Sequence, residues 1–248
     1  MSQPIYSPIL ELRMYALPPG RRDDLIRLFE REFVESQEAV GMQVIGQFYD
    51  LDDPNRFVWL RGFHDMSARA ESLNAFYSGP VWKAHREAAN ATMIDSDNVL
   101  LLRLPPGACG FSFNRAPRPP LGSRTKQDGF IVATIYYLDA PVGTEFIGYF
   151  ENTIKPVLIE AGASILAYFV TEDSPNTFPQ LPVREGENAF VWFAGFPDQE
   201  AHRRHLSRLR GSKVWSDEIT TFLKRNLESK PEVLRLTPTP CSWLTGKI

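Results

Sequence analysis

The sequence lacks several features that would point directly to a function. It has 2 cysteines, Cys109 and Cys241, among 248 residues, too few for a disulfide framework, so free thiols are favoured over a disulfide. Lys and Arg count 27 against 30 Asp and Glu, without a basic block, which argues against a nucleic-acid partner. No apolar run approaches the roughly 18 residues of a membrane span, and no leader-peptide pattern is present. We therefore expect a soluble, cytoplasmic protein with no membrane span.

Motifs of several large enzyme classes are missing too. The chain has no glycine-rich phosphate loop, no HExxH and no GxSxG, so nucleotide-binding, zinc-protease and α/β-hydrolase functions have no support. His202 and His205 share a helix face at a spacing that two metal ligands could use. Arg203 and Arg204 lie between them and no third ligand is in view, so a solvated basic face is expected. The sequence predicts neither a metal nor a cofactor.

What the chain does contain is an internal repeat. The segment FVWLRGFHD at 57–65 returns as FVWFAGFPD at 190–198. The offset, which is the distance in sequence between equivalent residues of the two copies, is 133 residues for Trp82 and Trp215. For equivalent residues nearer the start of each copy it is 121. The change of offset predicts an insertion in the second copy, which either covers a barrel mouth or is a tolerated surface loop.

The repeat divides the chain into two units and a connection. We expect repeat 1 over residues 1–108, a semi-rigid, proline-rich linker over 109–127, and repeat 2 over 128–248 with the insertion near 176–188.

Hydrophobic periodicity predicts the same order of elements in both units: strand, helix, strand, strand, helix, strand. This is the βαββαβ order of a ferredoxin-like unit, so the fold class is α+β. In repeat 1 the expected elements are strand 9–15, helix 21–40, strands 44–49 and 57–63, helical pieces 67–77 and 81–93, and strand 98–104. In repeat 2 they are strand 130–137, helix 144–161, strands 164–171 and 190–196, helical pieces within 199–226, and strand 233–236.

Aromatic residues gather on one face of these strands. Phe57, Trp59 and Phe63 alternate along one strand, and all three recur in repeat 2. We predict that helices cover the opposite face of each sheet, because bare aromatic faces would promote aggregation. Closing the two aromatic faces on each other, at about 25 cal/mol per Å² buried, predicts an intramolecular α+β barrel of about eight strands. Such a barrel is compatible with either a monomer or a homodimer, so the oligomeric state is not predicted.

Three segments of repeat 1 resemble a known family. ELRMYALPPG (11–20), FVWLRGFHD (57–65) and WKAHREAAN (82–90) are similar to the NIPSNAP family of the dimeric α+β barrel superfamily. The resemblance covers most of residues 10–104, but in repeat 2 only the strand at Phe190 and the helix at Trp215. It implies a ferredoxin-like barrel and little chemistry, since the wider superfamily includes cofactor-free monooxygenases, isomerases and heme enzymes.

Comparison of the two copies suggests a site in repeat 1. Glu11 and Arg61 are replaced by Val132 and Ala194 in repeat 2, and Arg13 is lost as well. We expect these charged residues on the inner face of the barrel, where burial is costly unless they are paired. Either Arg13 and Arg61 hold an anionic or carbonyl group in a pocket, or the three form an ion-pair network that seals the barrel end.

Further candidates surround this charged group. Tyr15 would orient a substrate, and the remaining ligand-binding candidates are Gln47, Tyr49, Trp59, His64 and Trp82, together with Glu11. The tryptophans recur in both copies, which favours packing first and a pocket wall second. His64 is a weaker candidate at the end of a strand.

His85 is the candidate general base, because it follows Trp82 by one turn and repeat 2 has Glu218 in its place. The alternatives are a half-buried surface histidine and, by analogy with superfamily relatives, a heme ligand.

These observations lead to one hypothesis and one rival. The hypothesis is a barrel that binds a small, aromatic or carbonyl-containing molecule in repeat 1. As an enzyme it would be a cofactor-independent oxygenase or isomerase, with His85 as base, Arg61 or Arg13 stabilising an oxyanion, and Tyr15 orienting. The rival is a non-catalytic structural or protein-interaction protein whose barrel is filled by side chains.

Overall fold

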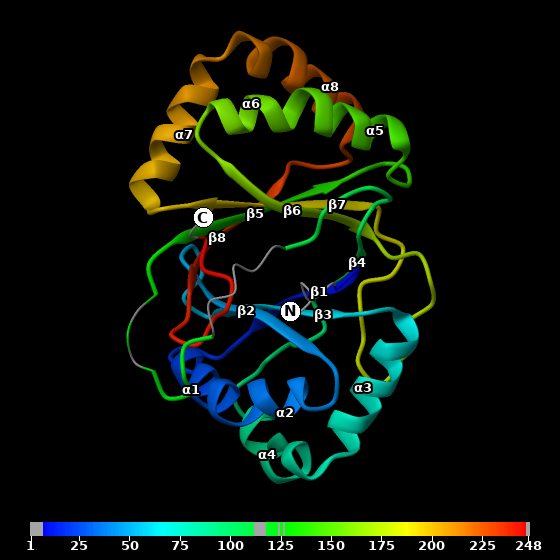
Figure 1. Cartoon of the computed structure of the whole chain (residues 1–248), viewed down its shortest axis with the longest axis vertical. Coiled ribbons are helices and arrows are strands. Elements are labelled where there is room, and N and C mark those ends of the chain that lie inside the picture. Colours follow the sequence, from blue (N-terminus) through cyan, green and yellow to red (C-terminus); the bar gives the residue numbers. More distant parts are fainter. Residues whose placement is uncertain (1–6, 112–117, 124, 126, 247–248) are drawn as a thin grey trace, which may run out of the picture.

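Eight antiparallel strands close into a single barrel in the order β1-β3-β2-β8-β5-β7-β6-β4, with helices on two opposite sides (Figure 1). The computed structural model describes residues 7–111, 118–123, 125 and 127–246. Repeat 1 contains β1 (Ile9–Ala16), α1 (Arg22–Leu28), the π-helical turn η1 (Phe29–Phe33), α2 (Val34–Glu38), β2 (Gln43–Asp50), β3 (Arg56–Phe63), α3 (Met66–Ser78), α4 (Pro80–Asn90) and β4 (Val99–Arg103). Repeat 2 contains β5 (Phe130–Tyr137), α5 (Thr144–Tyr149), the π-helical turn η2 (Phe150–Ile154), α6 (Lys155–Glu160), β6 (Ser164–Thr171), β7 (Ala189–Phe196), α7 (Gln199–Gly211), the π-helical turn η3 (Val214–Ile219), α8 (Thr220–Asn226) and β8 (Glu232–Pro238).

Each repeat forms one four-stranded sheet, and the two sheets are joined at both edges. The sheets are β4-β1-β3-β2 and β8-β5-β7-β6, the order of a ferredoxin-like unit. The first junction pairs Phe48 of β2 with Pro238 of β8, and the second pairs Leu102 of β4 with Thr171 of β6. The predicted fold, two tandem ferredoxin-like units in one intramolecular barrel, is confirmed.

Local sequence signals explain where the helices begin and end. Asp65 and Asp198 precede α3 and α7, and each carboxylate accepts a hydrogen bond from a backbone N–H of the first turn, 2.7 Å away. Gly79 ends α3, and Pro80 begins α4 at a position where its missing N–H has no cost. None of the helices within the described ranges is long and apolar enough to cross a membrane.

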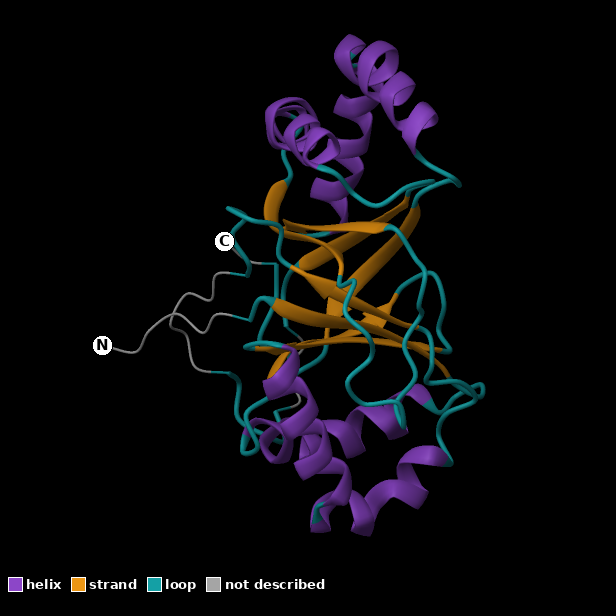
Figure 2. Cartoon of the chain, turned by 90° about the vertical axis from the view of Figure 1, so that its right-hand side faces the viewer, coloured by secondary structure: helices purple, strands orange, loops and turns teal. Residues whose placement is uncertain are grey.

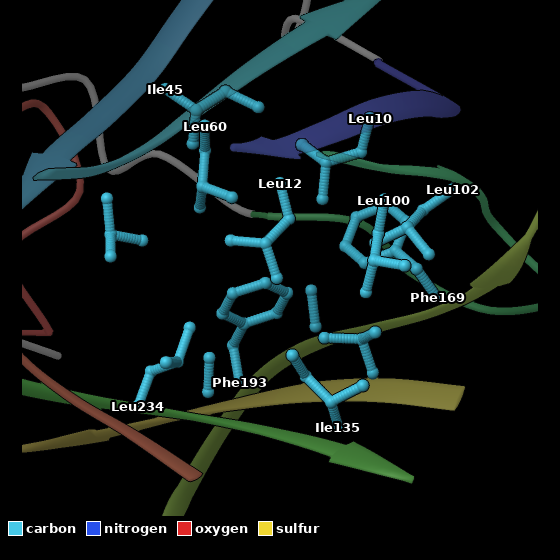
Figure 3. Close-up of a cluster of buried hydrophobic side chains, with 14 of the residues drawn as sticks. Leu10, Leu12, Ile45, Leu60, Leu100, Leu102, Ile135, Phe169, Phe193 and Leu234 are labelled. Carbon is cyan, nitrogen blue, oxygen red and sulfur yellow. The ribbon is translucent and has the colours of Figure 1, made fainter. Parts of the chain in front are cut away.

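The two faces of the strands are oriented opposite to the prediction. Leu12, Leu60, Ile135 and Phe193 meet inside the barrel (Figure 3). Trp59 instead packs with residues of the helices. An eight-stranded barrel leaves an interior just wide enough for side chains of moderate size to fill. The alternate positions that carry mostly Leu, Ile, Val and Ala therefore turn inward.

The bulky aromatic residues lie between each sheet and the helices that cover its outer face. Figure 2 shows these helices on opposite sides of the strands. In repeat 1 this layer includes Phe57, Trp59 and Phe63 of β3, packed against Phe29 and Phe33 of η1. The equivalent layer of repeat 2 contains Phe190, Trp192 and Phe196. The prediction that the aromatic faces close on each other is therefore wrong, although both are fully buried.

The longer connection of repeat 2 reaches repeat 1. Residues 172–188 join β6 to β7, where repeat 1 has only 51–55 between β2 and β3. This segment, yellow in Figure 1, runs from repeat 2 toward α3. Its Arg184 N–H donates to the carbonyl of Val99 at 2.9 Å, and Leu181 and Val183 pack against the repeat 1 core. The segment is therefore not a free surface loop, because it packs against repeat 1.

The predicted linker, 109–127, is only partly covered, since residues 112–117, 124 and 126 lie outside the described residues. Its Arg118 donates to a carboxylate oxygen of Glu38 and to the carbonyl of Val44, so the linker is attached to repeat 1 at this point. Both cysteines are free thiols as predicted, Cys109 exposed and Cys241 buried.

Candidate functional site

A single buried carboxylate holds three buried guanidinium groups in repeat 1. Glu11 Oε2 accepts from Arg13 Nη1 at 2.6 Å and from Arg61 Nε at 2.7 Å. Its other oxygen accepts from Arg69 Nε of α3 at 2.7 Å. All four side chains are completely buried, and we call them the Glu11 cluster. The cluster lies between the sheet and α3, and not on the inner face of the barrel where the sequence placed it.

The charges of the Glu11 cluster shift the acidity of its members. Burial by itself raises the pKa of Glu11, but Arg61, Arg13 and Arg69 outweigh it and hold that pKa well below its usual value. Burial lowers the pKa of Arg69, and Glu11 opposes that effect only in part. The carboxylate is therefore ionised, and positive charge remains in excess within the cluster.

Other polar groups complete the cluster only partly. Arg61 Nη1 donates to Gln37 Oε1 of α2 at 3.1 Å, and the guanidinium groups of Arg13 and Arg61 both lie against the ring of Trp59, 5.5 and 5.1 Å from its centroid. The Nη2 atoms of Arg61 and Arg69 have no hydrogen-bond partner among the described residues. The ion-pair network of Glu11, Arg13 and Arg61 that the sequence offered as one alternative is therefore present, with Arg69 as a further member and with two guanidinium nitrogens unpaired among the described residues.

Tyr15 connects the Glu11 cluster to a cavity. Arg13 Nε donates to the Tyr15 hydroxyl oxygen at 2.8 Å, so the guanidinium fixes the position of the phenol. Burial raises the pKa of Tyr15, and although Arg13 opposes this, the net effect is upward. The phenol is therefore protonated at neutral pH, and its proton is available to a partner other than Arg13.

The cavity beside Tyr15 measures about 460 Å³ and has walls of mixed character. Aromatic rings form much of the wall and small polar groups interrupt it. The lining residues are Tyr15, Asn74, Tyr77, Ser78, Trp82, Asn90, Met93, Ser96, Phe178, Gln180 and Leu181. None of these lining residues is Asp, Glu, His or Lys, so the described wall offers phenol, amide and hydroxyl groups but no ordinary base.

The connection from repeat 2 closes one side of this cavity. Phe178 stacks on Tyr77 with ring centroids 5.7 Å apart. Asn176 and Thr177 accept hydrogen bonds from Arg69 Nη1 at 2.9 and 3.2 Å. The same loop therefore contacts both the Glu11 cluster and the cavity wall.

Several predicted site residues lie elsewhere. Gln47 is buried on β2, in register with Trp59, but does not line the cavity. Tyr49 lines a separate surface groove and lies under the guanidinium of Arg22, 5.1 Å from its ring centre. His64 is exposed and pairs with Asp65. Of the ligand-binding candidates, only Trp82 lines the cavity, and Glu11 and Trp59 belong to the layer behind it.

His85 does not reach the cavity either. Its Nε2 lies 3.3 Å from Glu32 Oε2, and its ring contacts Phe33 on the outer side of the helical layer. The side chain is half-buried, which matches the surface alternative. At this place it fits neither the role of base for a ligand in the cavity nor that of a heme ligand there.

Sequence reasoning missed Arg69 and the loop residues, although a signal for Arg69 was present. Arg69 corresponds to His202 at the offset of 133 residues, so it shows the same loss of symmetry that singled out Glu11 and Arg61. Phe178 gave no such signal, because an inserted loop has no counterpart in the other repeat.

The two histidines of α7 also differ from expectation. His202 and His205 are buried against the sheet, with the His202 ring 5.1 Å from that of Phe130, and do not form a solvated basic face. Their side chains follow the helix face that packs inward, while Arg203 and Arg204 point outward. In the described part of the chain, no group of three or more His, Cys, Asp or Glu could hold a metal ion.

Comparison with known proteins identifies the first repeat and the fold. Residues 10–106 match the NIPSNAP family. A candidate monooxygenase from Fusobacterium nucleatum subsp. nucleatum superposes with a TM-score of 0.58 at 14% identity, over 95% of this chain and 94% of that one. One from Lactobacillus acidophilus gives 0.55 at 16% identity, over 94% of each chain. An anthrone oxidase-like protein gives 0.53 at 12% identity, over 99% of this chain and 100% of that one. These similarities concern the fold, and no match is found among curated proteins.

Proposed function

We propose that the cavity beside Tyr15, which lies mostly in the segment that matches the NIPSNAP family, binds a small aromatic, carbonyl-containing molecule. The observation that carries the proposal is the hydrogen bond from Arg13 Nε to the Tyr15 oxygen at the wall of an aromatic-lined cavity. Cavities of several hundred Å³ with apolar walls and a few fixed polar groups are typical of small-molecule sites.

The roles of the residues follow from their contacts. Glu11 holds Arg13, and Arg13 holds Tyr15, so the hydroxyl is positioned before a ligand arrives. Because the Tyr15 oxygen already accepts from a cation, its own O–H becomes a stronger donor toward a ligand carbonyl. Tyr77, Trp82 and Phe178 supply flat apolar surfaces for the ring of the ligand.

Cofactor-free oxygenation or isomerisation is the finer form of the proposal. Tyr15 would donate to the oxygen of an enolate or phenolate as negative charge develops there. Proton removal also needs a base, and the described lining residues provide none of the usual ones. We therefore assign binding to the cavity, and test turnover by oxygen uptake with anthrone as substrate. The cytoplasmic location, the monomeric or homodimeric state and the lack of a cofactor stay predictions.

The rival function, a structural or interaction protein with a filled barrel, agrees with the barrel interior. That interior is packed with side chains from both sheets. The cavity, however, lies outside the barrel, so a filled interior does not decide between the two functions.

The test compares two buried tyrosines at equivalent positions. Calorimetric titration is carried out with acetophenone and with ethylbenzene, which lacks the carbonyl. The difference between the two affinities measures what the Tyr15 hydroxyl contributes to binding. We expect Tyr15→Phe to bind acetophenone about fivefold to tenfold more weakly, the loss of one hydrogen bond, with ethylbenzene binding unchanged. Tyr136→Phe in repeat 2 is the control and should retain the preference for the ketone. Equal acetophenone affinity in the wild type and Tyr15→Phe would overturn the proposal.

A further inference from the structure

Repeat 2 has a second cavity at the place that the Glu11 cluster fills in repeat 1. The two sheets and the helices α3 and α7 are equivalent, so long charged side chains in one repeat are replaced by shorter ones in the other. The corresponding pairs are Glu11 and Val132, Arg13 and Thr134, and Arg69 and His202. The shorter residues leave a cavity of about 180 Å³ between the sheet and α7.

The wall of this second cavity is almost entirely apolar. Trp192 and Phe196 of β7, Leu209 of α7 and Trp215 of η3 contribute to it. No Lys, Arg, Asp or Glu is among its lining residues within the described chain. A charged molecule would lose its hydration there without compensation, so the cavity favours an uncharged one.

Exposed apolar residues mark the entrance. Leu206 and Val233 line the cavity and are 40% and 45% exposed, which is unusual for large hydrophobic residues in this chain. Apolar side chains at a rim give an apolar ligand favourable contacts on its way in.

Two polar atoms in the wall of the cavity have no hydrogen-bond partner among the described residues: Trp192 Nε1, which can only donate, and His205 Nδ1. His205 is 3% exposed and lines the cavity, and its Nδ1 has no hydrogen-bond partner among the described residues. Burial lowers the pKa of His205, so the ring is neutral at pH 7, although a hydrogen bond to the Ala161 carbonyl opposes the shift. A carbonyl can only accept, so the ring nitrogen that faces Ala161 carries the proton. Nδ1 is then an unused acceptor.

We propose that repeat 2 holds a second binding site, between β5, β7 and α7, for an uncharged one- or two-ring aromatic molecule with a single hydrogen-bond donor, such as a phenol or an indole. The aromatic walls take the rings and His205 Nδ1 accepts the O–H or N–H. This site is independent of the proposed function of repeat 1, whose cavity instead presents a donor to a carbonyl.

Anomalous scattering locates the site directly. Crystals soaked in 4-bromophenol should show a bromine peak between β5 and α7, lined by Trp192 and Leu209. A bromine peak only elsewhere, or none in repeat 2, overturns the proposal.

Two variants test the contacts in solution, with 2-naphthol and naphthalene as probes. Leu209→Phe introduces the residue that repeat 1 has at this position, Phe76, and should weaken the binding of both probes at least tenfold by filling the cavity. His205→Phe should bind naphthalene as the wild type does, and lose a preference for 2-naphthol of about fivefold. The control is Ser72→Ala, the repeat 1 counterpart of His205, which should leave both affinities unchanged.

The outcomes separate a binding site from a packing defect. Unchanged 2-naphthol affinity in both Leu209→Phe and His205→Phe overturns the proposal. If Leu209→Phe does not fold, His205→Phe decides alone, because the ratio of the two probe affinities within one variant does not depend on its stability. Acetophenone binding, which tests the repeat 1 cavity, should be the same in His205→Phe as in the wild type.

Discussion

Arg69 Nη1 donates to the side-chain oxygen of Asn176 at 2.9 Å, although Arg69 belongs to repeat 1 and Asn176 to the long connection of repeat 2. The same Arg69 donates through Nε to Glu11. The second copy thus supplies a piece of the first copy's site. The connection 51–55 of repeat 1 also contacts repeat 2, where Asp52 pairs with Arg235, but none of its residues lines the second cavity. The long connection of repeat 2 contributes to the wall of the repeat 1 cavity and to none of the wall of the second cavity.

Removing the aromatic ring of Phe178 from the loop should reduce ligand affinity more than it reduces the free energy of unfolding. Phe178→Ala removes the ring that stacks on Tyr77 and lines the cavity. We expect acetophenone affinity to fall about tenfold, while the free energy of unfolding falls by only about 1 kcal/mol, as for one aromatic pair. Titration calorimetry and urea unfolding measure the two quantities. Ser174→Ala, exposed in the same loop, should change neither, and a Phe178→Ala protein with wild-type affinity would contradict the prediction.

Removing the central carboxylate should strongly destabilise repeat 1. Glu11→Gln leaves three buried guanidinium groups without a counter-charge, and we expect the free energy of unfolding to fall by about 3–5 kcal/mol. Urea unfolding followed by tryptophan fluorescence measures it. The control is Glu32→Gln, whose half-buried carboxylate pairs at the surface and should cost no more than about 1 kcal/mol. A loss of similar size in both variants would show that the Glu11 cluster is not held by its anion.

Acid should destabilise the fold partly through His202. Burial first, and then His205 and Arg235, lower the pKa of His202 to about 4, from about 6.5 in the unfolded chain. Between these values the unfolded chain binds the proton and the folded one does not, so the free energy of unfolding falls as pH decreases from about 6.5 to 4. The full effect of this group on the free energy of unfolding is on the order of 3 kcal/mol.

Denaturant titrations at several pH values test this contribution. His202→Gln should have a flatter slope in that window, whereas His64→Gln, which alters an exposed histidine, should keep the wild-type slope. Glu11 acts at lower pH, because its pKa is lowered and its contribution is lost only below the unfolded value of about 4.3. Parallel curves for the wild type and His202→Gln would refute the assignment.

The two repeats should unfold as one unit. Phe193 lies in the barrel core among side chains of both sheets, and Phe193→Ala should lower the free energy of unfolding by about 3–5 kcal/mol (Figure 3). Because the core is shared, far-UV circular dichroism and tryptophan fluorescence should report coincident transitions in the variant as in the wild type. Leu51→Ala, at an exposed site, is the control. Separate transitions for the two probes would contradict a shared core.

The comparison of repeats predicted part of the site well. Loss of symmetry singled out Glu11, Arg13 and Arg61, and the structure brings them together. The same signal was misleading at His85, which lies at the surface and pairs with Glu32. Residues that face solvent can also differ between the two copies. Sequence divergence marks a change of surroundings, and only coordinates tell whether those surroundings are a cavity or a surface.

The sequence by itself determined the order of the elements and their duplication, because hydrophobic period, helix caps and repeated segments are local properties of the chain. Only the tertiary structure decided which strand face turned inward. Both faces of β3 are apolar, with Phe57 and Trp59 alternating with Val58 and Leu60, so alternation alone cannot choose between them. The narrow interior of the barrel accepts the smaller side chains, and the helices then cover the aromatic rings, the Glu11 cluster and both cavities.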